Sequence, residues 1–145
     1  MRRAMIVPLL CLFVLPMSAH AATPVPGPPT IAIEAFEYLP SGTVTTLGAT
    51  GAQQLWIQEV PAGVDVTVIN LEPTYPTFQH TVTECASPCL SVAHPTAKTG
   101  GFDTGIVSYG GTTKTIASSS LTPGVHDYFC KLHDWMRGSI QVLGT

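Results

Sequence analysis

The chain places a thiol, an imidazole and a thioether at steps of three residues near its C-terminus. These side chains belong to Cys130, His133 and Met136, within the segment YFCKLHDWMRG. A tightly curled loop with such steps can direct all three donors toward one point. Sulfur and imidazole donors in one cluster indicate a transition-metal site and narrow the choice of metal. We therefore expect a metal centre here, completed by at least one further strong ligand.

The best candidate for the missing ligand is His80. It begins the strand-like segment HTVTE after a loop, much as Cys130 ends HDYFC before one, and such positions can meet at one end of a β-sandwich. Methionine is not a usual zinc ligand, iron–sulfur clusters need more thiolates, and c-type haem needs a C-x-x-C-H segment. Two imidazoles, one thiolate and an axial thioether are the blue-copper set. We predict one mononuclear copper ion held by His80, Cys130, His133 and Met136.

Simpler explanations exist for each of these residues. Met136 and Trp135 could be core residues at the entry to a strand, and an unpaired Cys130 could be a small buried apolar residue. Together, these explanations would also have to account for the register of three donors, an upstream histidine and an exported chain. The copper site accounts for all of these features at once.

The other cysteines of the exported chain are Cys85 and Cys89, in ECASPCL. They are close enough to form a small disulfide loop, as thiols of exported proteins usually do, which leaves Cys130 unpaired. Metal coordination would protect that unpaired sulfur. A C-x-x-x-C pair also occurs in binuclear copper centres, but His94 is misplaced for one and Ala97 stands where a methionine would fall. We therefore favour the disulfide.

The N-terminal residues predict a signal for export. Two arginines, an apolar stretch and Ala19-His20-Ala21 are typical of a signal peptide, expected over 1–21. The apolar stretch is short for a membrane span, so no stable span is expected after cleavage. A proline-rich leader over 22–29 would precede one domain over 30–145. The chain has 6 Lys and Arg against 9 Asp and Glu, which does not favour nucleic-acid binding.

Between Thr30 and the C-terminus the sequence alternates like β-strands. TIAIEAFE, VDVTVIN, HTVTE, TTKTIAS, HDYFC and GSIQVL are short alternating segments, with a weaker one at QLWIQEV. Segments rich in Pro, Gly and Ser separate them, and none sustains helical periodicity. About seven or eight short strands with such turns predict an all-β fold, an antiparallel β-sandwich.

The segment YFCKLHDWMRGSIQV, with the upstream segments VDVTVIN and FQHTVTE, resembles the small cupredoxins, especially amicyanin, pseudoazurin and plastocyanin. This resemblance covers roughly Thr30 to the C-terminus, and the C-x-x-H-x-x-M spacing is its most specific part. It implies a Greek-key β-sandwich, one type 1 copper, and a soluble electron carrier in the periplasm. It also implies that His133 is the exposed ligand through which electrons pass.

The chain departs from the family at residues beside the ligands. Thr81 follows the first histidine, where the family often has an asparagine that braces the ligand loop, and we expect its hydroxyl to replace part of that bracing. Leu132 and Asp134 flank His133, where amicyanin-like loops tend to carry proline, and both have backbone N–H groups that proline lacks. A hydrogen bond from the Leu132 N–H to the Cys130 sulfur would raise the reduction potential.

The leading functional interpretation is an exported blue copper protein that carries single electrons between redox partners, a cytochrome or an oxidoreductase, as a monomer. We expect no enzymatic turnover, because this ligand set leaves no open coordination position. An extracytoplasmic protein that binds and delivers copper is the alternative. The chain lacks the Met-rich or His-rich tracts of such proteins outside its signal. A metal-free interaction module with the same sandwich is the third possibility.

Overall fold

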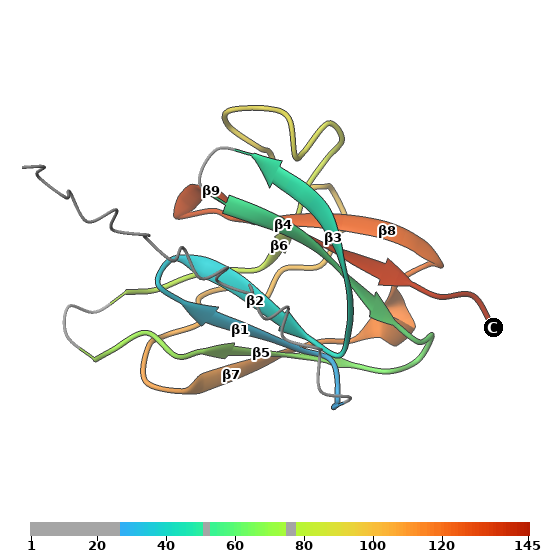
Figure 1. Cartoon of the computed structure of the whole chain (residues 1–145), viewed down its shortest axis with the longest axis horizontal. Helices are drawn as coiled ribbons and strands as arrows, with labels where there is room; N and C mark the ends of the chain where they lie inside the picture. Colours follow the sequence, from blue (N-terminus) through green and yellow to red (C-terminus); the bar gives the residue numbers. More distant parts are fainter. Residues whose placement is uncertain (1–26, 51–52, 75–77) are drawn as a thin grey trace, which may run out of the picture.

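A computed structural model describes residues 27–50, 53–74 and 78–145 of the chain. Two β-sheets pack face to face (Figure 1), with one short 3-10 helix, η1, at Ser118–Ser120. The expected signal peptide over 1–21 and most of the leader over 22–29 lie outside the described residues. Among the residues that are described, no helix has the length and apolar character required to span a membrane.

The first sheet has four strands in the order β2-β1-β5-β7. Their bounds are β1 Thr30–Glu34, β2 Glu37–Ser41, β5 Val66–Asn70 and β7 Thr112–Ile116. Burial alternates along β1 and β5, as the period of two in the sequence predicts, so that one face of each strand packs into the core. The carbonyl of Pro29 accepts a hydrogen bond from Thr67 N–H at 3.0 Å, which fastens the end of the leader to this sheet.

The second sheet has five strands in the order β3-β4-β9-β8-β6. Their bounds are β3 Thr43–Thr50, β4 Gln53–Val60, β6 Thr83–Glu84, β8 Gly124–Cys130 and β9 His133–Val142. The core between the sheets is made of buried side chains from both, among them Ile31, Val68, Tyr128 and Ile140. The predicted all-β Greek-key β-sandwich is confirmed, with nine strands in the described residues.

The pairing of the strands is mixed, whereas the sequence led us to expect antiparallel neighbours throughout. β1 pairs in parallel with β5, and β4 pairs in parallel with β9. Parallel neighbours need a crossover connection, and here the chain passes through the other sheet between them. The alternation of apolar residues shows which face of a strand is buried but not which strand lies beside it, so it could not reveal this mixture.

The segment from Cys130 to Met136 is a bulged hairpin, where we expected a curled loop ending near Gly138. Strand β9 already begins at His133, and Cys130 pairs with His133 across a two-residue turn. The preceding pair joins Phe129 to Arg137, so residues 134–136 are extra residues on β9. We call them the β9 bulge. A bulge redirects side chains locally, and this one includes the predicted ligand Met136.

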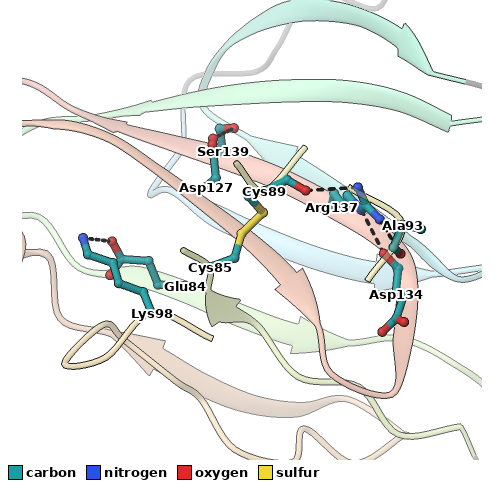
Figure 2. Close-up of a disulfide and its surroundings, with 9 residues drawn as sticks. All are labelled: Glu84, Cys85, Cys89, Ala93, Lys98, Asp127, Asp134, Arg137 and Ser139. Atoms are coloured by element: carbon teal, nitrogen blue, oxygen red, sulfur yellow. Dashed lines mark hydrogen bonds and ion pairs between the residues drawn. A yellow bond between two sulfur atoms is a disulfide. The ribbon is translucent and has the colours of Figure 1, made fainter. Parts of the chain in front are cut away.

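Cys85 and Cys89 form the expected disulfide (Figure 2). Both side chains are buried and pack with Phe129, the residue before Cys130. Cys130 itself is the free cysteine of the described residues, and it is buried. The interpretation of Cys85 and Cys89 as ligands of a binuclear copper centre is therefore wrong, because their sulfurs are bonded to each other.

Candidate metal centre

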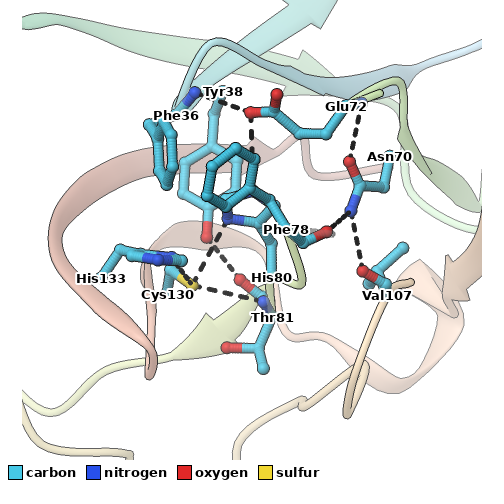
Figure 3. Close-up of polar contacts among 10 residues, drawn as sticks. All are labelled: Phe36, Tyr38, Asn70, Glu72, Phe78, His80, Thr81, Val107, Cys130 and His133. Carbon is cyan, nitrogen blue, oxygen red and sulfur yellow. Dashed lines mark hydrogen bonds and ion pairs between the residues drawn. The ribbon is translucent and has the colours of Figure 1, made fainter. Parts of the chain in front are cut away.

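Three of the four predicted ligands converge at one end of the sandwich. Cys130 ends β8, His133 begins β9, and His80 is held by a β-bridge to Val107. One donor atom from each of the three lies within 4.8 Å of the other two. The Cys130 sulfur lies 3.9 Å from Nδ1 of His80 and 3.6 Å from Nδ1 of His133 (Figure 3).

These spacings suit a metal ion placed between the donors. With metal–donor distances of about 2.0–2.3 Å, as in zinc sites, trigonal ligands lie roughly 3.5–3.8 Å apart. The two sulfur–nitrogen distances, 3.9 Å and 3.6 Å, are close to that range. His80 and Cys130 are fully buried, whereas His133 is half-buried and reaches the surface. The donor set, one sulfur and two imidazoles, is suited to one copper ion.

Both histidines are held in the neutral form that metal binding requires. Burial lowers the pKa of His80, and a charge on His133 lowers it further, against an opposing effect of Glu72. Burial also lowers the pKa of His133, again opposed by Glu72. A neutral imidazole keeps a lone pair on one nitrogen, so both rings are ready to coordinate near neutral pH.

The predicted axial ligand Met136 lies in the β9 bulge. Its side chain is fully buried and belongs to the same core cluster as Cys130. This burial agrees equally with a core role and with a weak axial bond. Its role as a ligand therefore stays a prediction.

Thr81 braces the ligand hairpin as its position in the sequence predicted. Its hydroxyl oxygen accepts a hydrogen bond from the N–H of Lys131 at 2.9 Å, directly after Cys130. Its own N–H donates to the Cys130 sulfur at 3.4 Å. The bond that we expected from the Leu132 N–H to this sulfur is not formed among the described residues. The donor is instead Thr81, which lies just before β6, the strand that pairs with β8.

A buried carboxylate supports the other side of His80. Oε1 of Glu72 lies 3.6 Å from Nε2 of His80 and accepts a hydrogen bond from Phe36 N–H at 2.8 Å. Asn70 fixes this region, since its Oδ1 accepts from Glu72 N–H at 3.0 Å and its Nδ2 donates to the Val107 carbonyl at 2.9 Å. The contact between Glu72 and His80 is an ion-pair distance, because Nε2 of His80 has no hydrogen-bond partner within the described residues.

Sequence reasoning did not single out Glu72 and found no specific role for Asn70. The one available signal was a carboxylate two residues beyond a buried strand, in INLEP. That signal is weak, because such a position is usually exposed. The structure gives both residues a place behind His80.

Aromatic rings surround the two imidazoles. The Phe36 ring packs edge-on against His133 and His80, with centroids 5.0 Å and 5.6 Å away. Phe36 and Ala35 occupy the β1–β2 turn with φ of 60° and 51°, a conformation that side-chain-bearing residues seldom adopt. Trp135 lies 5.2 Å from His133 and is 55% exposed. The half-buried His133 ring thus contacts two aromatic rings, of which Trp135 is exposed.

The other two described histidines do not join the site. His126 places Nδ1 2.9 Å from a carboxylate oxygen of Glu84 and Nε2 2.8 Å from the carbonyl of Thr122, so both of its nitrogens have hydrogen-bond partners outside the site. His94 is exposed, and its Nδ1 lies 2.6 Å from Oδ2 of Asp134.

Comparison with known proteins bears on the fold. No protein-family model matches the chain, and no curated protein matches it. The chain is similar to the structure of an oxidized methionine-to-leucine mutant of amicyanin, with a TM-score of 0.51, 18% identity, and coverage of 81% of this chain and 84% of that one. The fold is that of the cupredoxins.

Two further solved structures are similar at lower TM-scores. A reduced Cu(I) form at pH 4 of a proline-to-glycine mutant of amicyanin gives a TM-score of 0.48 and 21% identity, covering 81% of this chain and 84% of that chain. A purple cupredoxin from Nitrosopumilus maritimus gives a TM-score of 0.46 and 21% identity, covering 64% of this chain and 85% of that chain. These two likenesses are too weak to support an argument about function, and the candidate metal centre of this chain depends on its own geometry.

Proposed function

We propose that this protein binds one copper ion through His80, Cys130 and His133, with Met136 as the axial ligand, and carries single electrons between redox partners. The observation that carries the proposal is the convergence of three donor atoms within 4.8 Å of one another. A bound copper ion supplies a one-electron couple between Cu(I) and Cu(II). The chain's own part is to present these donors in a fixed arrangement.

The surroundings of the donors support electron transfer over metal delivery. Thr81 holds the sulfur and the hairpin, and Glu72 lies behind His80, so the ligands have little freedom to rearrange. A site that rearranges little when its charge changes transfers electrons quickly. His80 and Cys130 are fully buried, which would slow the release of metal to an acceptor protein.

His133 is the group through which electrons would enter and leave. It is half-buried, and the exposed side chains of Leu132 and Trp135 flank it at 49% and 55% exposure. Transient redox complexes bury little surface, and the two exposed apolar side chains beside this half-buried residue offer a small contact area of that kind. We infer a cytochrome or an oxidoreductase as partner, a monomeric carrier, and no turnover of a small molecule. Export to the periplasm through cleavage after Ala21 completes the proposal.

The test is the visible spectrum of the purified protein after addition of copper(II). We expect an intense thiolate-to-copper absorption, which Cys130→Ser abolishes and Lys114→Gln, at an exposed lysine of β7, preserves. A reversible one-electron potential and slow loss of copper to a chelator are expected for a carrier. A colourless protein, or a Cys130→Ser variant with the same spectrum, would refute the site. Rapid loss of copper would favour delivery instead.

Export has its own test. Mass spectrometry of protein from the periplasmic fraction should find an N-terminus at Ala22. Recovery of the intact chain in the cytoplasmic fraction would contradict this part of the proposal alone.

A further inference from the structure

The segment from Cys85 to Ala97 forms a closed loop, which we call the disulfide loop. Figure 2 shows three of its residues, Cys85, Cys89 and Ala93, close to Arg137. Its ends are joined by a β-bridge between Cys85 and Ala97 and by a hydrogen bond from Ala86 N–H to the Thr96 carbonyl at 2.9 Å. The Cys85–Cys89 disulfide closes its first half. The loop is a compact unit, and the copper site described above does not include it.

One guanidinium connects this loop to the β9 bulge. The Nε–H of Arg137 donates to the Asp134 carbonyl at 2.8 Å, inside the bulge. Nη1 donates to the carbonyl of Cys89 and Nη2 to that of Ala93, each at 3.1 Å. Three donors of a rigid planar group thus hold three carbonyls, one on the hairpin and two on the loop. A lysine ammonium on a flexible stem cannot reproduce this geometry.

The bulge needs such support because it lacks the ordinary pairing of a strand. Between the pairs Phe129–Arg137 and Cys130–His133, residues 134–136 have no opposite residue on β8. Met136 lies inside this stretch and His133 directly before it. The position of the Asp134 carbonyl therefore influences both predicted ligands of β9, and Arg137 is the side chain that fixes this carbonyl.

The loop also contacts the neighbouring strand that carries Cys130. The buried disulfide packs on Phe129, and the Cys85 N–H donates to the Asp127 carbonyl at 2.9 Å. A further contact joins His94 to Asp134, but both groups are exposed, so water weakens that pair. The loop consequently has one attachment to β8 and another to the bulge of β9.

We propose that the disulfide loop is an external brace for the copper site and that Arg137 is its positioning residue. Arg137 transfers the rigidity of the disulfide loop to the β9 bulge, which keeps His133 and Met136 in place for the metal. The part that concerns copper rests on the proposed function. The part that concerns the bulge does not.

The experiment measures the bulge in the metal-free protein first. In wild-type protein, ¹⁵N relaxation should give order parameters of about 0.85 for residues 134–136, as for a rigid backbone, and Arg137→Lys should lower them below about 0.6. The double variant Cys85→Ser and Cys89→Ser should lower them in the same direction. The order parameters of β5 should not change in either variant. Lys114→Gln, which alters an exposed basic residue on β7, is the control and should leave the order parameters of residues 134–136 unchanged.

The second measurement uses copper-loaded protein. Arg137→Lys should lose copper to a chelator at least ten times faster than wild type and change its visible spectrum, while Lys114→Gln changes neither. Unchanged order parameters at residues 134–136 in both Arg137→Lys and the double cysteine variant would overturn the proposal. An equal loss of order in β5 would also overturn it, because it would indicate general destabilisation. If wild-type protein binds no copper but Arg137→Lys still mobilises the bulge, the brace stands and the proposed function fails.

Discussion

Replacing Thr81 with valine removes one hydroxyl group while keeping the branched shape of the side chain. Thr81 is 1% exposed, so solvent does not reach the side chain readily. Its hydroxyl oxygen accepts hydrogen bonds from Lys131 N–H at 2.9 Å and from the Thr83 hydroxyl at 3.1 Å. The Thr83 hydroxyl retains Asp103 Oδ1 at 3.0 Å as an acceptor in the variant. The N–H of Lys131 is therefore the group that loses its partner.

The expected cost follows from this one unsatisfied donor. A buried N–H without an acceptor costs about 1–3 kcal/mol, and partial access of water at Lys131 favours the lower half of that range. For an m-value of about 2 kcal/mol per M, a loss of about 1–2 kcal/mol lowers the urea midpoint of the metal-free protein by roughly 0.5–1 M. If the loss is local, amide exchange at Lys131 accelerates about tenfold for each 1.4 kcal/mol.

Amide hydrogen exchange followed by NMR distinguishes this cause from a general loss of packing. Thr81→Ser is the matched control, because it keeps the hydroxyl and removes the methyl group. We expect Thr81→Val to accelerate exchange at Lys131 and Thr81→Ser to leave that residue protected, even if the missing methyl group lowers global stability. Wild-type protection of Lys131 in Thr81→Val would refute the bracing role of the hydroxyl.

Other predictions concern the core and its buried charge. Burial alone would raise the pKa of Glu84, but hydrogen bonds from Lys98 and neighbouring donors outweigh it and lower the pKa below 4.5. Its contribution to stability is therefore complete above pH 4.5 and is lost as the pH falls through the folded pKa. In urea titrations at a series of pH values, Glu84→Gln should lack this fall in the free energy of unfolding. Gly138→Ala places a Cβ against the Tyr128 ring, which should cost about 1–3 kcal/mol in thermal unfolding; an unchanged midpoint would contradict the packing. Tyr128→Phe removes a buried hydroxyl with no partner in the described structure, so the free energy of unfolding should stay the same or rise. Tyr38→Phe removes a donor to a buried carbonyl and should cost about 1 kcal/mol of that free energy. Equal effects of the two variants would contradict this contrast.

The donors of the metal centre could be predicted because the type of a residue alone determines which donor atom it can offer to a metal. One unpaired cysteine, two histidines and a methionine form a donor set that favours copper over other metals. Three of these donors, Cys130, His133 and Met136, are also close together in the sequence. His80 required the further inference that two strands end at the same side of a sandwich. The structure confirms that His80, Cys130 and His133 converge.

The supporting residues were harder to predict because their roles depend on contacts between distant segments. Arg137 follows Met136 in the sequence, yet two of its three partners lie 44 and 48 residues away. Glu72 lies 3.6 Å from His80, and no local pattern in the sequence predicts this contact. The bulge was also hidden, because residues 133–137 show no alternation that distinguishes a bulged strand from a loop. Thr81 was predictable only because the resemblance drew attention to its position.

The two braces together explain how the hairpin can be stiff without proline. The resemblance leads one to expect proline on both sides of His133, where a fixed φ would limit the motion of the chain. Here the N–H of Lys131 is bound by Thr81, and the carbonyl of Asp134 is bound by Arg137, so the backbone is fastened on both sides of the half-buried ligand. Proline would confer stiffness locally, whereas these bonds come from side chains outside the turn. The rigidity of His133 therefore depends on the position of the disulfide loop, and a change there can reach the metal centre without touching a ligand.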